Sequence, residues 1–344
     1  MTDIKKITLV SSEISGLWNS YMANSSIICS LKFYINNVDD EETRSILQYT
    51  LDLSNQHNQV LGDFFIQASL PIPDGFTDDD VNVNAPRLFT DEFYLLYLSN
   101  LSKAQMMNYT QILSNCARLD IREFFTKLIS ESSDIYNKVT EIRLSKGIFT
   151  RFPVVEVPKK VEYIKSENFM DDWFGEKRPL LVGEITHISL IILANILGRA
   201  IITGFGQVSK RKEIVEYMFR GRDISSKKID IFTSILTSEN IPIPSTSYSF
   251  VTDSTVAPYS EKLMMFKIIA LGTISIVNDG MALAESLRTD LQVKFIRITP
   301  EVLKYIKDGS DIMIENKWLE QPPQCIDHKN LEIGRASCRE RVFA

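Results

Sequence analysis

Cysteine and histidine are scarce in this chain of 344 residues, which contains 4 of the first and 3 of the second. Cys29, Cys116 and Cys325 lie far apart and none belongs to a Cys-x-x-Cys pair. This usage excludes a small secreted scaffold held together by disulfides, and it predicts reduced thiols. The first residues also lack the basic start and the apolar run of a signal peptide, so we expect a cytoplasmic protein.

Positive charge is not in excess. The chain has 38 Lys and Arg against 44 Asp and Glu, which gives a net charge of -6. Proteins that bind nucleic acid usually present a basic surface, so no nucleic acid is expected among the partners. A charged fraction of 24% with 44% apolar residues is ordinary for a globular protein and excludes a disordered polyelectrolyte.

Long uninterrupted apolar runs are missing too. The longest covers residues 185–205 and is broken by His187, Asn195 and Arg199. Since charges are rare at the centre of a membrane-spanning helix, we predict no membrane span and a helix buried in a core. Residues 264–271 are likewise apolar on nearly every side, so both segments should face the other half of the chain or a second copy, as in a homodimer.

The sequence does contain an internal repeat. Leu70-Pro71-Ile72-Pro73 matches Ile241-Pro242-Ile243-Pro244, and Glu13-Ile14-Ser15 matches Glu184-Ile185-Thr186, both at an offset of 171. Arg118-Leu119-Asp120-Ile121 matches Arg288-Thr289-Asp290-Leu291 at an offset of 170. Matches in the same order, with an offset that drifts by one, indicate a tandem duplication.

Apolar residues recur at helical spacing in both halves, and each half has a long proline-containing connection after its second helix. Four helices with one long middle crossover predict an up-down-down-up bundle of the ferritin-like kind. The predicted fold is therefore all-α, with two tandem ferritin-like four-helix bundles over residues 7–150 and 180–320 and a linker over 151–179. Ser12 is expected to cap the first helix, Gly147 to end the fourth, and Pro300 to kink or restart the last, with Thr299 as its cap.

Five segments resemble a known family of uncharacterised Bacillus-type proteins, the family of the domain of unknown function DUF3231. They are Asn84-Ala85-Pro86-Arg87-Leu88-Phe89, Leu144-Ser145-Lys146-Gly147, Trp173-Phe174-Gly175-Glu176-Lys177-Arg178-Pro179-Leu180, Thr252-Asp253-Ser254-Thr255 and Trp318-Leu319-Glu320-Gln321-Pro322-Pro323-Gln324. The resemblance covers residues 7 to about 329. It implies tandem ferritin-like bundles and a distant relationship to the spore coat F-type proteins of endospore-forming bacteria, without an established reaction.

A ferritin-like bundle raises the question of a metal site, which takes inward-facing Glu residues and Glu-x-x-His motifs. Glu184-Ile185-Thr186-His187 is the only Glu-x-x-His in the chain, and its counterpart Glu13-Ile14-Ser15-Gly16 carries glycine in place of histidine. The candidate ligands for iron or manganese are Glu184 and His187 with Asp223, or Glu13 with His57. The alternative is that both glutamates stabilise the first turns of their helices and that both histidines are hydrogen-bonded core residues.

The favoured prediction is that the chain is a structural or interaction protein without catalytic activity, from a spore-forming bacterium and associated with the spore coat. It would act through protein partners or self-association, with Trp173 and Phe174 of the linker and the apolar helix faces making contacts. The alternative is a ferritin-like metal-dependent oxidase or peroxide-handling enzyme with a reduced metal site. A third is a protein that binds an apolar ligand between its helices.

The C-terminal end differs from the rest of the chain. Glu332 to Val342 can be encoded by a common sequencing adapter read in frame. We therefore expect residues 332–344 to be a sequencing-adapter artefact, and they are left out of the fold prediction. The alternative is a genuine basic tail.

Overall fold

The structure is a computed structural model that describes residues 8–165, 169–170, 178–246 and 249–325. Within these ranges the regular elements are helices and the chain contains no strand, which confirms the all-α prediction. The first half consists of α1 (Ser11–Asn37), α2 (Glu41–Gln67), the short 3-10 helix η2 (Asp78–Asp80), α3 (Asp91–Leu113) and α4 (Leu119–Ser145). The second consists of α5 (Val182–Val208), α6 (Lys212–Ser238), α7 (Glu261–Glu285) and α8 (Thr289–Glu315).

The helices form two four-helix bundles with the predicted course. The amides of Ala117 and Arg118, just before α4, donate to Glu13 in the first turn of α1, so these helices start at the same end. The amide of Asp40, just before α2, donates to Asp91 at the start of α3, so α2 and α3 both start at the other end. The directions are therefore up, down, down, up, and the connection from α2 to α3 runs the length of the bundle.

The two crossovers pair with each other along a local two-fold axis. Residue pairs Val81–Tyr259 and Phe89–Val251 form isolated antiparallel bridges. Since Val81 corresponds to Val251 and Phe89 to Tyr259 at the repeat offset of 170, each bridge is the symmetry equivalent of the other. The backbone hydrogen bonds follow the same rule: Asn82 N donates to Pro258 O and Thr252 N donates to Leu88 O, at 2.8 and 3.0 Å. The bundles thus associate as the subunits of a two-fold dimer do.

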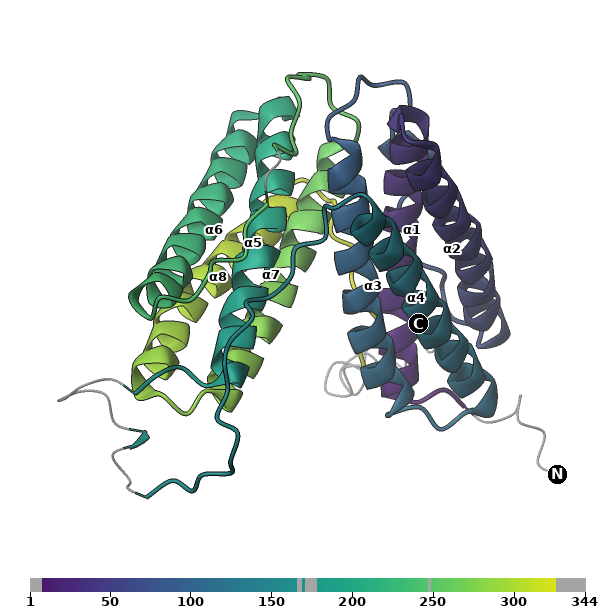
Figure 1. Ribbon diagram of the computed structural model, residues 1–344. Helices are drawn as coiled ribbons and strands as arrows, with labels where there is room; N and C mark the ends of the chain where they lie inside the picture. The colour runs from purple at the N-terminus through teal and green to yellow at the C-terminus, as the bar shows by residue number, and fades with distance from the viewer. Residues whose placement is uncertain (1–7, 166–168, 171–177, 247–248, 326–344) are drawn as a thin grey trace, which may run out of the picture.

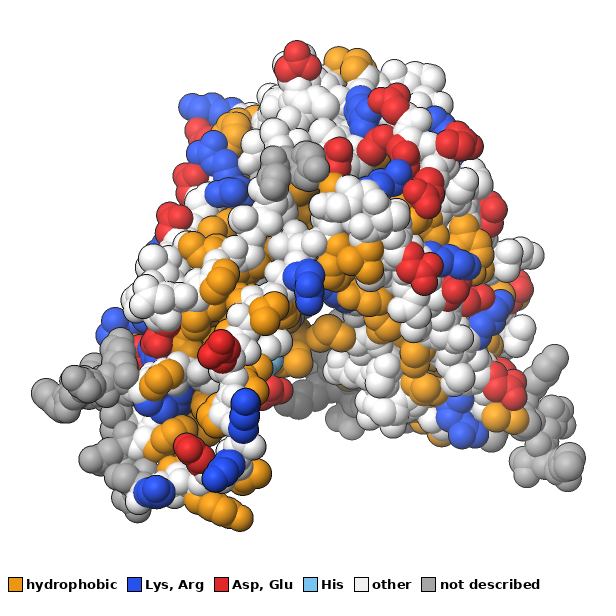
Figure 2. All heavy atoms as spheres, in the orientation of Figure 1, with side chains coloured by type: hydrophobic (Ala, Val, Ile, Leu, Met, Phe, Trp, Pro, Cys, Tyr) orange, Lys and Arg blue, Asp and Glu red, His pale blue; other side chains and the backbone are white. Residues whose placement is uncertain are grey.

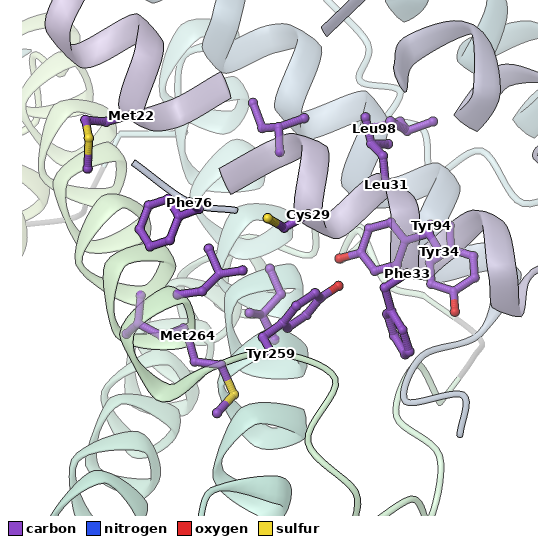
Figure 3. Packing of buried hydrophobic residues seen from close by; sticks show 14 of the residues in the cluster. Met22, Cys29, Leu31, Phe33, Tyr34, Phe76, Tyr94, Leu98, Tyr259 and Met264 are labelled. Carbon is purple, nitrogen blue, oxygen red and sulfur yellow. The ribbon is translucent and has the colours of Figure 1, made fainter. Parts of the chain in front are cut away.

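The apolar core continues through this junction. In Figure 1 the bundles stand as two legs that converge where the crossovers meet. Figure 3 shows Tyr259 and Met264 of the second half beside side chains of the first, and the ring of Tyr259 lies 5.5 Å from that of Phe33. On the symmetry-related side, Phe89 reaches the backbone of α5 at Gly204, where a Cβ would lie 2.7 Å from its ring. The same cluster of buried apolar residues therefore includes side chains of both bundles.

Details of the helix ends confirm the duplication and correct two expectations. Gly147 adopts the left-handed conformation, with φ of 68°, and so does its counterpart Lys317, with φ of 58°. The N-cap of α1 is Val10, and the hydroxyl of Ser12 instead donates to Asn115 O. Helix α8 continues through Pro300 without restarting, and Thr299 donates its hydroxyl to Phe295 O rather than capping a new helix.

Two helices, α5 and α7, are long and apolar enough to cross a membrane by length and composition. The apolar window of α5 is 67% buried, as expected of a core helix, whereas that of α7 is only 39% buried. A helix that is apolar all round but incompletely covered leaves hydrophobic surface in water. The two apolar segments therefore have different environments.

Gly204→Ala should destabilise the protein by about 2 kcal/mol, because the new methyl group meets a ring that stacks on Phe93 and cannot move away. Thermal and urea unfolding would measure the loss. Gly62→Ala is the matched control: no atom lies within 4 Å of the added Cβ, so it should be neutral or stabilising by about 1 kcal/mol. Equal effects of the two variants would contradict the close packing at the junction.

Candidate functional site

The two glutamates predicted as metal ligands lie in equivalent, almost fully buried positions, 0% and 1% exposed. The carboxylate of Glu13 accepts hydrogen bonds from Val10 N at 3.0 Å and from Ala117 N and Arg118 N at 2.8 Å. It therefore joins the N-terminus of α1 to that of α4. Both helix ends carry partial positive charge and unpaired amides, so a carboxylate between them is stabilised from both sides.

Glu184 does the same in the second bundle. Its carboxylate accepts from Leu181 N at 2.8 Å and from Leu287 N and Arg288 N at 3.1 Å, which joins α5 to α8. It also receives two hydrogen bonds from the guanidinium of Arg178, at 2.8 and 2.9 Å. Burial on its own would raise the pKa of Glu184, but Arg178 and the backbone amides outweigh it and the pKa is lowered.

A second pair of carboxylates joins the other two helix starts. Asp91, the first residue of α3, accepts from Asp39 N and Asp40 N at 3.3 and 2.9 Å. Its counterpart Glu261, the first residue of α7, accepts from Lys210 N and Arg211 N at 3.0 and 3.1 Å. Each bundle is therefore closed at both ends by one carboxylate that bridges two helix N-termini.

Each bundle interior holds a polar pair, and one member of each pair occupies an equivalent position. His57 of α2 corresponds to Lys228 of α6, and both side chains are paired. The imidazole Nε2 of His57 lies 2.6 Å from a carboxylate oxygen of Glu131 in α4. The ammonium of Lys228 donates to both oxygens of Asp279 in α7, at 2.7 and 2.8 Å.

Burial shifts these groups towards their neutral forms. It lowers the pKa of His57 despite the opposing effect of Glu131, and it lowers the pKa of Lys228. Burial also raises the pKa of Asp279, which is 1% exposed. Each partner of the Lys228–Asp279 pair favours the charged form of the other, so the pair depends on both members being present.

The predicted metal ligands are engaged separately. Glu184 binds Arg178 and backbone amides, the Nε2 of His187 lies 2.8 Å from Glu285, and the exposed Asp223 accepts from Arg222 at 2.8 Å. Glu13 likewise binds amides while His57 binds Glu131. Within the described ranges, no three His, Cys, Asp or Glu side chains are grouped closely enough to hold a metal ion. Trp173 and Phe174 lie outside the described residues.

Sequence reasoning missed the Asp91 and Glu261 bridges and the Lys228–Asp279 pair. A signal for the first was present, because an acidic residue opens the third helix of both repeats directly after a Thr or Ser cap. The sequence carried no signal for the Lys228–Asp279 pair, since Asp279 is indistinguishable from a charged residue on a helix surface.

The described surface includes two depressions near the features above. One, of about 500 Å³, is open and lies on α4 near the His57–Glu131 pair, with charged walls that include Arg122, Glu123 and Lys127. The other, of about 180 Å³, lies between the halves and is lined by residues that include Arg143, Phe149 and Phe250. Neither has the apolar, enclosed character of a site for a hydrophobic ligand.

These features define a class of protein: two tandem four-helix bundles that are joined about a local two-fold axis and closed by carboxylate bridges. The chain belongs to the family described as "Protein of unknown function (DUF3231)", whose model matches residues 1–161 and 168–331. The match confirms the resemblance noted in the sequence. No curated protein matches the chain significantly.

A solved structure from Bacillus halodurans C-125, described as a "putative spore coat protein", is similar to part of the chain. The two sequences are 18% identical, and the alignment covers 45% of this chain and 100% of the other, with a TM-score of 0.41.

Glu184→Gln should destabilise the protein by about 3 kcal/mol at neutral pH, because it leaves the largely buried guanidinium of Arg178 without its anionic partner. The pKa of Glu184 is lowered in the folded state, so its contribution is present above the unfolded value near 4.3 and is lost as the pH falls through the folded value. The difference between wild type and variant should therefore shrink in acid, as followed by urea unfolding from pH 7 to pH 3.

The control for this measurement is Glu213→Gln, which removes an exposed acid from the first turn of α6 and should cost less than about 1 kcal/mol. A loss for Glu184→Gln that stays the same at every pH would contradict the ionic role of its carboxylate.

Proposed function

We propose that this chain is a non-enzymatic structural or interaction protein of a spore-forming bacterium, and that it works in association with the spore coat. The absence of catalytic activity in this proposal is supported by the way the buried charged side chains are engaged. Glu13 and Glu184 bind backbone amides, and Lys228 and Asp279 bind each other. Polar groups used in this way stabilise a scaffold and leave little free to take part in chemistry.

The second part, the spore coat, rests on the family resemblance and not on any contact in the structure. Antibody detection in extracts of purified spores and of vegetative cells tests it. The protein should be enriched in the coat extract and released by the alkaline or detergent treatments that remove coat proteins. Confinement to the soluble fraction of vegetative cells would contradict this part of the proposal.

The competing function is a metal-dependent oxidase that uses iron or manganese at Glu184 and His187. Full-length protein purified from cells grown with added iron and manganese should contain fewer than about one metal ion per ten chains, because a site of this kind needs several free donors. Elemental analysis measures the ratio. Stoichiometric metal that disappears in the His187→Ala variant, but not in His57→Ala, would overturn the non-enzymatic proposal and assign the site to the second bundle.

A further inference from the structure

One helix face in the second bundle is apolar, exposed and free of charge. On α7, Ile274, Val277 and Met281 are 39%, 47% and 41% exposed, and they follow one another at helical spacing. Thr273 and Gly280, on the same face, are exposed as well. We call this surface of α7, from Thr273 to Met281, the α7 face. In Figure 2 hydrophobic side chains gather on the visible side of the second bundle, where both α7 and the linker in front of it lie.

The charged residue within this stretch does not reach the α7 face. Asp279 points into the bundle, is 1% exposed, and is paired with Lys228. A helix face that is meant for water normally carries charged and polar side chains. The α7 face has no such side chain apart from the hydroxyl of Thr273, and it therefore has the composition of a covered surface.

The first repeat supplies an internal comparison. At the offset of 170, the residues of α3 that correspond to Thr273, Ile274, Val277, Gly280 and Met281 are Lys103, Ala104, Met107, Thr110 and Gln111. The same position in the same fold is thus more polar in α3, and a stable bundle does not need an apolar face there. The apolar character of α7 needs an explanation outside the bundle.

We propose that the α7 face binds the α7 face of a second copy of this chain, in an antiparallel pair of helices about a two-fold axis near Val277. The second copy would be the first partner of the proposed interaction protein. This inference rests on the proposed function only for the premise that helix faces make contacts. A two-fold pair needs a self-complementary surface, and a face without charge meets its own copy without repulsion. On a chain with a net charge of -6, such a face is where two copies approach most easily.

Two further observations favour a second copy of this chain. The small residues Thr273 and Gly280 flank the larger side chains, which lets two helix axes come close and lets Val277 fit between the side chains of the other copy. The α7 face also continues an established interface. Earlier on the same helix, Phe266 packs 4.9 Å from Phe76 of the first crossover, and Met264 and Met265 are fully buried.

Analytical ultracentrifugation of the full-length protein, over a concentration range from about 1 to about 200 µM, tests the proposal. Wild type should form dimers as concentration rises. Val277→Glu should weaken the dimer at least about 100-fold, because the two-fold axis buries two like charges together. Val60→Glu is the matched control, since Val60 is 38% exposed on α2 of the other bundle, and it should leave the dimer unchanged. Circular dichroism and melting temperature show that both variants are folded.

Three outcomes would overturn the proposal: a monomer at every concentration, equal weakening by both variants, or binding of the monomer to vesicles of phosphatidylcholine and phosphatidylglycerol that Val277→Glu abolishes. The last would assign the α7 face to a lipid surface. None of them bears on metal content or on the presence of the protein in spore coats, so a failure here is distinguishable from a failure of the proposed function.

Discussion

The fold depends on a carboxylate placed between two helix N-termini. Helix starts leave unpaired amides, and two starts side by side would leave twice as many without partners in a buried place. Glu13 accepts from amides at the starts of both α1 and α4. At the opposite end Asp91, the first residue of α3, accepts from the amides before α2, while Thr90 caps α3 itself. The same carboxylates fix which helices start together. They therefore specify the up-down-down-up course as well as stabilising it.

Both repeats keep these carboxylate bridges, whereas their core residues differ. Where a core residue is larger in one repeat, the residue opposite it is smaller. In the second bundle Tyr217 and Tyr305 stack at 4.2 Å, and the hydroxyl of each lies over a glycine on the opposite helix, Gly309 or Gly221. In the first bundle Ile46 and Ile135 correspond to the two tyrosines, and Val139 and Thr50 correspond to the two glycines. In the second bundle a tyrosine lies against a glycine, whereas the first bundle has two residues of middle size at the same positions. The space between the second and fourth helices is therefore filled in both bundles.

Much of the fold could be predicted from the sequence because its signals are local and occur twice. Helical periodicity, the breaks at proline and the offset of the repeats each needed only neighbouring residues or a comparison of the chain with itself. The roles of the candidate ligands could not be predicted in this way. Glu13 binds amides 104 and 105 residues away. The local sequence around a glutamate in a first helical turn is the same whether its carboxylate binds a metal ion or a backbone amide. Lys228 and Asp279 are paired because α6 and α7 are oriented with these two side chains facing each other. No local sequence pattern predicts how two helices are oriented about their axes.

The junction between the bundles is two-fold in its backbone but not in its side chains. Phe89 packs on Gly204, whereas its counterpart Tyr259 packs on Phe33, the residue that corresponds to Gly204. An aromatic ring enters the junction from both sides, so the two sides differ chiefly in what the ring meets, a phenylalanine in one case and a glycine in the other. Duplication followed by divergence has thus kept the backbone pairing of the junction while making its two sides unequal, so that an added methyl group at Gly204 meets a ring, whereas Phe33 already fills the equivalent position.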